Sequence, residues 1–337
     1  MSCRLLFPLA LLLATPALAA DPGADCDRLA ASPVDAGRPA GMATVPFEKL
    51  DAPAAVTACE AAVAASPGTL RYVYELGRSY DAAKRSDDAR RLYQQAADAG
   101  YAAAENYLGY AYERGDNGFP KDAVAALKYY RLAAAQENPD AETSVGYFTE
   151  HGLGGLSPDF KEAAVWYRKA ADHGLPEGML GLGHLYMIGS GVDKDQAKGA
   201  ALYRQAAETG DSRGEAQYGL TLAAGVGVPR NDEEAVMWLR KAAEQDEPTA
   251  EDALGIMLSL GRGTRQDNIE AVQWMRKSAE QGNPAGEFNL GVMYKEGRVA
   301  GAEAADMRAE AVKWLKKAAA DGYQDAAKML AEMGETN

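Results

Sequence analysis

Residues that could perform catalysis or hold a metal ion are sparse in this sequence. Three His and three Cys occur among 337 residues, which leaves little material for a metal site rich in either type. No Ser stands in a G-x-S-x-G context, and the patterns S-x-x-K, H-E-x-x-H and G-x-x-x-x-G-K-[ST] do not occur. Acidic residues are spread along the chain without two that pair as an acid and a base. We therefore predict that the protein is not an enzyme and has no catalytic residues, no cofactor and no metal.

The first 20 residues have the layout of a secretory signal peptide. Arg4 supplies a positive charge, an apolar stretch runs over 5–13, and small residues end the segment at Ala19 and Ala20. The apolar stretch is shorter than the roughly 20 residues of a membrane-spanning helix, although an uncleaved anchor is the alternative interpretation. No other stretch is long and apolar enough to span a bilayer. We expect an exported protein, periplasmic or secreted, without stable membrane insertion once the signal is cleaved.

Export determines how the cysteines are interpreted. Cys3 would leave with the signal peptide, so Cys26 and Cys59 would be the two thiols left in an oxidising compartment. We predict a disulfide between them that stabilises the fold by about 3 kcal/mol; two separate buried thiols are the alternative. Residues 21–53, the N-terminal arm, are rich in Pro, Gly, Asp and Ala and are predicted to be irregular. Cys59 falls in a predicted helix over 54–65, so the bridge would fasten the arm to that helix.

The rest of the sequence repeats one pattern. A glycine preceded by an apolar residue or Tyr recurs seven times, at intervals of 32 to 37 residues. These repeat glycines are Gly77, Gly109, Gly146, Gly183, Gly219, Gly255 and Gly291. Further along each repeat comes a pair of small residues, such as Ala170-Ala171, with a bulky residue four positions before it. All four Trp of the chain stand in that bulky column.

Each repeat is predicted to consist of two helices. In the first, a small residue five positions before the repeat glycine and an apolar or aromatic residue three positions after it share one helix face. Glycine inside a helix costs about 1 kcal/mol relative to Ala, so its recurrence indicates a close approach of the partner helix. The Trp column of the second helix is predicted to lie in the core. Glycine after the second helix is expected in the left-handed conformation that ends many helices.

These columns carry a family resemblance. The pattern small-x-x-x-Leu-Gly-x-x-Tyr-x-x-Gly-x-Gly-Val, then Asp-x-x-x-Ala-x-x-Trp-Tyr-Arg-x-Ala-Ala-x-x-Gly, resembles the Sel1-like repeat of the tetratricopeptide superfamily. The resemblance implies an all-α fold, a right-handed α-solenoid of about seven Sel1-like helix pairs with a short irregular N-terminal arm. We expect the following division: signal peptide 1–20, arm and first helix 21–68, seven repeats 69–323, and a C-terminal capping helix and tail 324–337.

The resemblance also implies where a partner would bind. In tetratricopeptide-type folds the first helix of each pair lines an extended concave surface. The expected groove columns lie three positions before, one after and four after each repeat glycine. From them we select the candidate partner-binding residues Tyr74, Arg78, Asn106, Tyr110, Glu113, Thr143, Tyr147 and His184. The same columns become apolar in later repeats, for example at Leu220 and Ile256.

Composition narrows the kind of partner. Asp and Glu number 49 against 35 Lys and Arg, a net charge of −14 that argues against general binding to nucleic acid or anionic lipid. The resemblance implies a non-enzymatic scaffold or adaptor that holds a segment of another envelope protein and regulates that protein or its assembly. Two alternatives remain open, a cell-wall or β-lactam-related enzyme or binder and a secreted host-interaction factor. The missing S-x-x-K, and the missing Cys pair in each repeat, weaken the β-lactam alternative.

Overall fold

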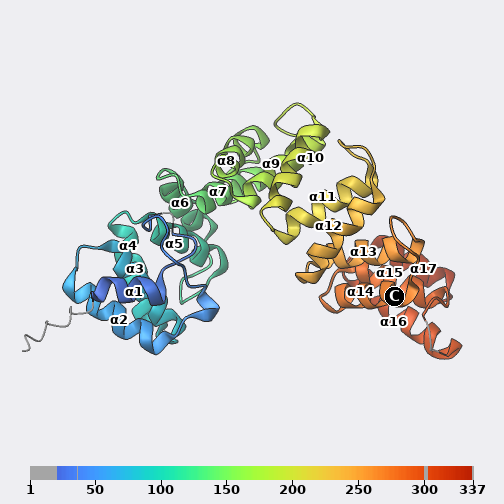
Figure 1. The fold of residues 1–337 in the computed structure, drawn as a ribbon, viewed down its shortest axis with the longest axis horizontal. Coiled ribbons are helices and arrows are strands. Elements are labelled where there is room, and N and C mark those ends of the chain that lie inside the picture. Colours follow the sequence, from blue (N-terminus) through green and yellow to red (C-terminus); the bar gives the residue numbers. More distant parts are fainter. Residues whose placement is uncertain (1–20, 36, 300–302, 336–337) are drawn as a thin grey trace, which may run out of the picture. The chain divides into compact units, whose positions relative to one another are not determined.

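The described part of the chain is helical. The computed structural model describes residues 21–35, 37–299 and 303–335, so the predicted signal peptide lies outside it. Within those residues the regular elements are all helices, and none of these helices has both the length and the apolar character needed to cross a membrane. The helices divide into two compact units, with the boundary after Asp122 (Figure 1).

Unit 1 contains the arm and the first repeat helices. Its elements are α1 (Pro22–Ala30), the 3-10 helix η1 (Phe47–Lys49), α2 (Ala52–Ala65), α3 (Leu70–Ala82), α4 (Ser86–Asp98) and α5 (Ala102–Arg114). Each α-helix packs on the next, and α1 also contacts α3 (Figure 1).

The arm was predicted to be irregular, but it begins with the helix α1. Asp21 caps this helix by accepting a hydrogen bond from the backbone of Gly23 at 3.0 Å, and Pro22 occupies the first turn, where its missing N–H costs nothing. Cys26 and Ala30 lie on the same face of α1 and are fully buried. The later prolines of the arm do separate α1 from α2, apart from the short η1.

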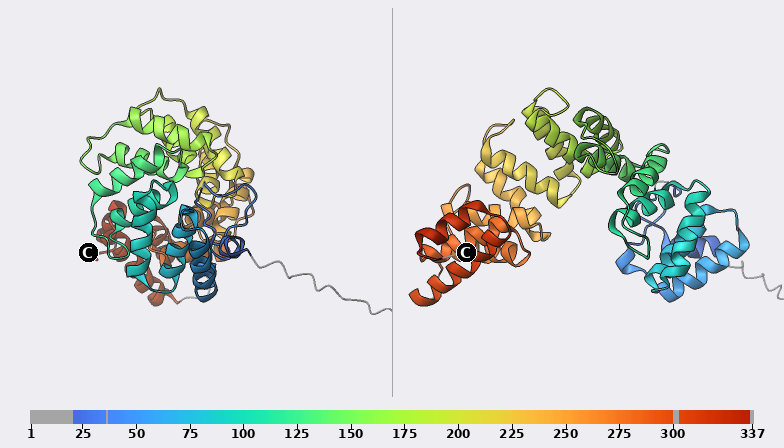
Figure 2. Two further views of the ribbon diagram at one scale, coloured as in Figure 1. Left: turned by 90° about the vertical axis from the view of Figure 1, so that its left-hand side faces the viewer. Right: turned by 180° about the vertical axis from the view of Figure 1, so that it is seen from behind.

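Unit 2 is itself a succession of packed helices (Figure 2). Its elements are α6 (Ala123–Ala134), α7 (Pro139–His151), α8 (Phe160–Asp172), α9 (Pro176–Ile188), α10 (Gln196–Glu208), α11 (Ser212–Ala224), α12 (Asp232–Glu244), α13 (Pro248–Leu260), α14 (Asn268–Glu280), α15 (Pro284–Lys295), α16 (Ala304–Ala320) and α17 (Gln324–Glu332). First helices of successive repeats also touch directly, as α7 does α9 and α11 does α13. The segment expected to be a capping helix contains α17, which packs on α16.

The repeat glycines sit where two helices approach closely. A Cβ added at Gly146 would lie 2.8 Å from the ring of Tyr167, and one at Gly183 would lie 2.8 Å from the ring of Tyr203. Both distances are shorter than real carbon contacts. At Gly219, Gly255 and Gly291 the close side chain is Leu239, Met275 or Leu315. The recurrence of glycine is therefore explained by a large side chain of the second helix packed against the backbone of the first.

The predicted core position of the Trp column is wrong for most of its members. Trp166, Trp238 and Trp274 are only partly buried, whereas Trp314 is buried. The fully core-facing position is the next residue of the second helix, namely Tyr93, Tyr130, Tyr167, Tyr203, Leu239, Met275 and Leu315. The Trp rings lie at the edge of the core, where each indole N–H donates to the Glu four positions earlier, as Trp274 does to Glu270 at 3.1 Å.

Candidate functional site

A disulfide joins the arm to the first long helix. Cys26 of α1 and Cys59 of α2 are bonded at an S–S distance of 1.99 Å, which confirms the predicted pairing. Both cysteines are fully buried, among Ala30, Ala55 and Leu76. The arm is thus held covalently on unit 1, and its path over the following helices is fixed.

The arm crosses α3 and engages Arg78, one of the candidate partner-binding residues. The guanidinium of Arg78 donates to the carbonyl of Ala30 and, at 3.0 Å, to the carbonyl of Val45. The hydroxyl of Tyr101 donates to Asp35, which places a second contact between the arm and the repeats. Arg78 is consequently buried, with 5% of its surface exposed. Tyr74 packs against the rings of Tyr93 and Tyr101 and is 2% exposed. Their expected role in partner binding remains a prediction.

A cavity of about 600 Å³ opens between the arm and the inner side chains of α3, α4 and α5. It is lined by Ser32, Pro33, Val34, Pro46, Phe47, Glu48, Tyr74, Arg78, Asp81, Tyr93, Tyr107, Tyr110, Asp116 and Asn117. Three large side chains at this cavity are exposed, namely Val34 at 43%, Phe47 at 47% and Tyr110 at 46%. A volume of this size, with apolar walls and a few polar groups, is typical of ligand sites.

Tyrosine rings packed against one another and one carboxylate line part of the cavity. The rings of Tyr93 and Tyr107 lie 3.8 Å apart between centroids, and Tyr74 lies 5.7 Å from Tyr93. The Asp81 carboxylate accepts hydrogen bonds from the amide of Asn117 at 2.8 Å and from the hydroxyl of Tyr107 at 3.3 Å. Burial, followed by the charge of Asp81, raises the pKa of Tyr107, so this phenol stays neutral.

Beneath the disulfide lies a buried charge cluster that the sequence analysis missed. Arg71 pairs with Asp27 at 3.1 Å, and the fully buried Glu75 places Oε2 3.2 Å from the sulfur of Cys26. Burial first, and then the charge of Asp27, raises the pKa of Glu75 to about 8 despite the opposing effect of Arg71. Nothing in the repeat pattern marks Glu75, because its position holds Tyr, Ser, Gly, Gln, Ala or Asn in the other repeats.

The same place contains metal-ligand residue types. In the described part of the chain Cys26, Cys59 and Glu75 bring their side-chain ligand atoms within 4.8 Å of one another. Both sulfurs are bonded to each other, so neither is a thiolate that could bind a metal. With the disulfide formed, this cluster fits a structural role.

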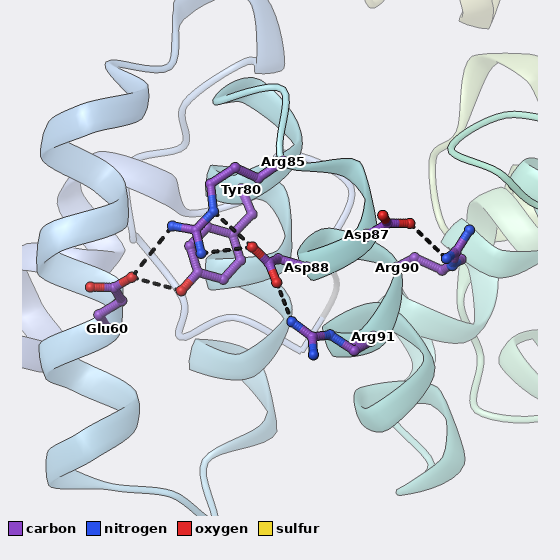
Figure 3. Close-up of polar contacts among 7 residues, drawn as sticks. All are labelled: Glu60, Tyr80, Arg85, Asp87, Asp88, Arg90 and Arg91. Carbon is purple, nitrogen blue, oxygen red and sulfur yellow. Dashed lines mark hydrogen bonds and ion pairs between the residues drawn. The ribbon is translucent and has the colours of Figure 1, made fainter.

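A second polar cluster joins α2, α3 and α4, and its charges are paired with each other (Figure 3). The Arg85 guanidinium lies 3.8 Å from the ring centroid of Tyr80, whose hydroxyl donates to Glu60 at 2.6 Å. Arg85 also pairs with Asp88 at 2.7 Å, and the hydrogen bond from Arg85 lowers the pKa of Asp88. Arg91 pairs with Asp88 as well. Because each acid already has a basic partner, this cluster ties helices together.

In the first two repeats that lie wholly in unit 2, the residue directly after the repeat glycine is exposed. Tyr147 is 45% exposed and lies 4.2 Å from the ring of His151, and His184 of α9 is also exposed. Thr143 is half-buried and donates to the carbonyl of Pro139 at 3.2 Å. Two candidates from unit 1, Asn106 and Glu113, are half-buried on α5.

Further along unit 2 the same column is apolar. Leu220 of α11 and Ile256 of α13 line a cavity of about 240 Å³, together with Met257 and the aliphatic part of Arg262. Arg262 donates to the carbonyl of Ala223 at 2.8 Å and pairs with Asp232 at 2.8 Å, so its charge is already neutralised. The expected change from aromatic and polar to apolar side chains is present within this unit.

A column of buried carboxylates, which sequence reasoning also missed, links the first and second helices of a repeat. Four positions before the repeat glycine stand Glu105, Glu142, Glu215, Glu251 and Glu287, all buried. In unit 2, Lys277 reaches Glu251 at 2.9 Å and Lys317 reaches Glu287 at 2.6 Å. Burial is the main cause that raises the pKa of Glu251, and Lys277 opposes it. The recurrence of Glu at one column was the signal that could have revealed these contacts.

The repeated helix pairs, with a glycine of one helix against a ring or an apolar side chain of the next, define an α-helical repeat protein. The Sel1 repeat family matches seven consecutive segments, 61–101, 102–138, 139–175, 176–211, 212–247, 248–283 and 284–323. These segments cover more than half of the chain, which therefore belongs to the Sel1 repeat family. Repeats of this type generally mediate protein–protein interaction.

Two solved structures are similar to this chain. One is c5321, a protective antigen of uropathogenic Escherichia coli strains, with 30% sequence identity and a TM-score of 0.65 over 82% of this chain. The match spans 59% of the c5321 chain. The other is a Sel1 repeat protein from Oxalobacter formigenes, with 30% identity and a TM-score of 0.65 over 73% of this chain and 96% of that one. Among curated proteins no match was found.

Proposed function

We propose that this protein is an exported, non-enzymatic scaffold that holds a segment of another envelope protein against the first helices of its repeats. One observation carries the proposal. The column after the repeat glycine presents Tyr110 and Tyr147 with nearly half of each side chain exposed, on rigid helices. Exposed aromatic side chains on a rigid element are typical anchors of protein interfaces.

The buried disulfide supports export. Disulfides form and persist in oxidising compartments, and Cys26 and Cys59 are both fully buried in theirs. The layout of residues 1–20 agrees with a signal peptide. Together these observations favour the periplasm as the place where the scaffold works.

In-cell crosslinking of the exported protein, followed by affinity capture and mass spectrometry, tests the proposal. A double variant with Tyr147→Ala and Ile256→Ala should lower capture of the partner at least tenfold, because truncation of two interface anchors costs about 2 kcal/mol or more in total. The control is Met237→Ala, which removes a side chain that is 46% exposed on the second helix α12. Equal capture by the double variant and the wild type would refute the placement.

A factor released from the cell is the second candidate. The similarity that favours it is to c5321, which is described as a protective antigen. Fractionation separates the two functions, since a scaffold for an envelope protein should stay in the periplasmic fraction. A mature protein found mainly in the culture medium would favour the released factor.

A further inference from the structure

The charges around the cavity of unit 1 are unbalanced. Among the described residues that line it are three carboxylates, those of Glu48, Asp81 and Asp116, and one guanidinium, that of Arg78. That guanidinium already donates to the carbonyls of Ala30 and Val45. The cavity therefore offers more negative than positive charge to anything that enters it.

Asp81 is a half-buried carboxylate of this cavity. In the described part of the chain its hydrogen-bond donors are neutral, the amide of Asn117 at 2.8 Å and the hydroxyl of Tyr107 at 3.3 Å. Asp116, in contrast, pairs with Arg114 at 3.3 Å. A half-buried carboxylate held by neutral donors is stabilised further when a cation reaches it, because the surroundings screen the charge less than bulk water does.

Aromatic rings complete a surface that suits a cation with an apolar stem. The Arg114 guanidinium lies 5.4 Å from the ring centroid of Tyr110, which shows that this ring can pack against such a group. Tyr74, Tyr93 and Tyr107 present three more rings. The exposed Val34 and Phe47 stand at the same cavity and can contact the methylene groups of a long side chain.

We infer that this cavity receives an Arg or Lys side chain of the bound partner segment, with its charged end at Asp81 and its stem among the tyrosines and Phe47. The inference rests on the proposed function, since it assumes a protein segment as the ligand. It assigns to the cavity a preference for basic segments that the apolar column of unit 2 does not share.

The probe is a positional-scanning library of octapeptides, applied to the full mature protein with its disulfide intact. The wild type should enrich Arg and Lys at one position at least tenfold over Glu. Replacing Arg by the neutral isostere citrulline in a retained peptide should weaken binding about tenfold, the usual effect of one buried charge-assisted contact.

Variants test whether the preference for basic residues arises at this cavity. Asp81→Asn should abolish the preference for basic residues, whereas Glu244→Gln, an equal change of net charge at an exposed site on α12, should leave it intact. Tyr110→Leu changes an exposed side chain, so the fold should be retained. It should reduce the preference for basic residues several-fold. Circular dichroism of each variant confirms that the helices are retained.

Several outcomes would overturn the inference. These are a library without retained peptides, enrichment of acidic instead of basic residues, and basic enrichment that Asp81→Asn and Tyr110→Leu leave unchanged. In-cell capture is independent of the library, so a partner that is captured through Tyr147 and Ile256 would keep the proposed function while the basic-residue site fails. Loss of both would reject the proposed function as well.

Discussion

Single residues of unit 1 show how the arm changes the chemistry of the first repeat. Cys26 and Cys59 were predicted to pair from residue type and compartment, and the disulfide confirms it. Tyr110 and Tyr147 were predicted to line a partner-binding groove, and that role stays a prediction. The burial of Arg78 and Glu75 could not be predicted in the same way. Both depend on the path of the arm, which has no repeat of its own from which a position could be inferred.

Glu75 should make stability depend on pH. Its folded-state pKa, raised to about 8 from an ordinary 4.5, means that the folded protein holds a proton that the unfolded chain releases. This contribution to stability is fully present below about pH 4.5 and is lost as pH rises through 8. Between pH 5 and 8 the free energy of unfolding of unit 1 should fall by roughly 3 kcal/mol relative to Glu75→Gln.

The measurement is urea unfolding at a series of pH values, with the wild type and Glu75→Gln compared at each. The difference between the two curves isolates this carboxyl from other acids with raised pKa values, such as Asp140 and Asp252, which are present in both proteins. Parallel curves would show that Glu75 does not hold a proton in the folded state.

At the scale of helices, the repeat pattern predicted the close approach at the repeat glycines and the left-handed glycines after the second helices, such as Gly174 with φ of 84°. It misplaced the Trp column by one residue. Neighbouring residues of a helix are about 100° apart, so either column could have faced the core until the helices were packed. The Trp rings stay at the edge of the core because their indole N–H groups donate to Glu residues. Periodicity alone does not assign those Glu residues.

Two repeats lack the glycine that ends the second helix, and this predicts a stabilising substitution. Glu137 and Asp246 adopt the left-handed conformation with φ of 59° and 63°. A residue with a Cβ pays about 1–2 kcal/mol there, so Glu137→Gly should raise the free energy of unfolding of unit 2 by up to about 1 kcal/mol.

Gly174 gives the matched control. It occupies the equivalent position in the next repeat, and a Cβ added there would meet no atom within 4 Å. Gly174→Ala should therefore destabilise by about 1 kcal/mol through backbone strain alone. Thermal unfolding of both variants checks the pair, and a stabilising effect of Gly174→Ala would contradict the explanation.

At the scale of the whole molecule, the disulfide of the arm should stabilise unit 1 and not unit 2. Removing the link through Cys26→Ser and Cys59→Ser should lower the free energy of unfolding of unit 1 by about 3 kcal/mol, since the disulfide closes a loop with a sequence separation of 33. Hydrogen exchange should accelerate in the arm and α3. The helices from α9 to α15 should exchange as before.

Peptide mapping under non-reducing conditions first verifies that the exported protein contains the Cys26–Cys59 peptide pair. Exchange that accelerates equally in both units would mean that the two unfold as one body. Unchanged exchange in the arm would mean that its contacts through Arg78 and Tyr101 hold it without the disulfide.

The fastened arm has a further consequence for recognition. A series of near-identical repeats offers a bound segment several equivalent registers, shifted from one another by one repeat. The arm is present once and covers the start of the series, where Arg78 is already engaged by backbone carbonyls. The first repeat is therefore unlike every later one. A ligand that recognises it can bind in one direction and in one register only.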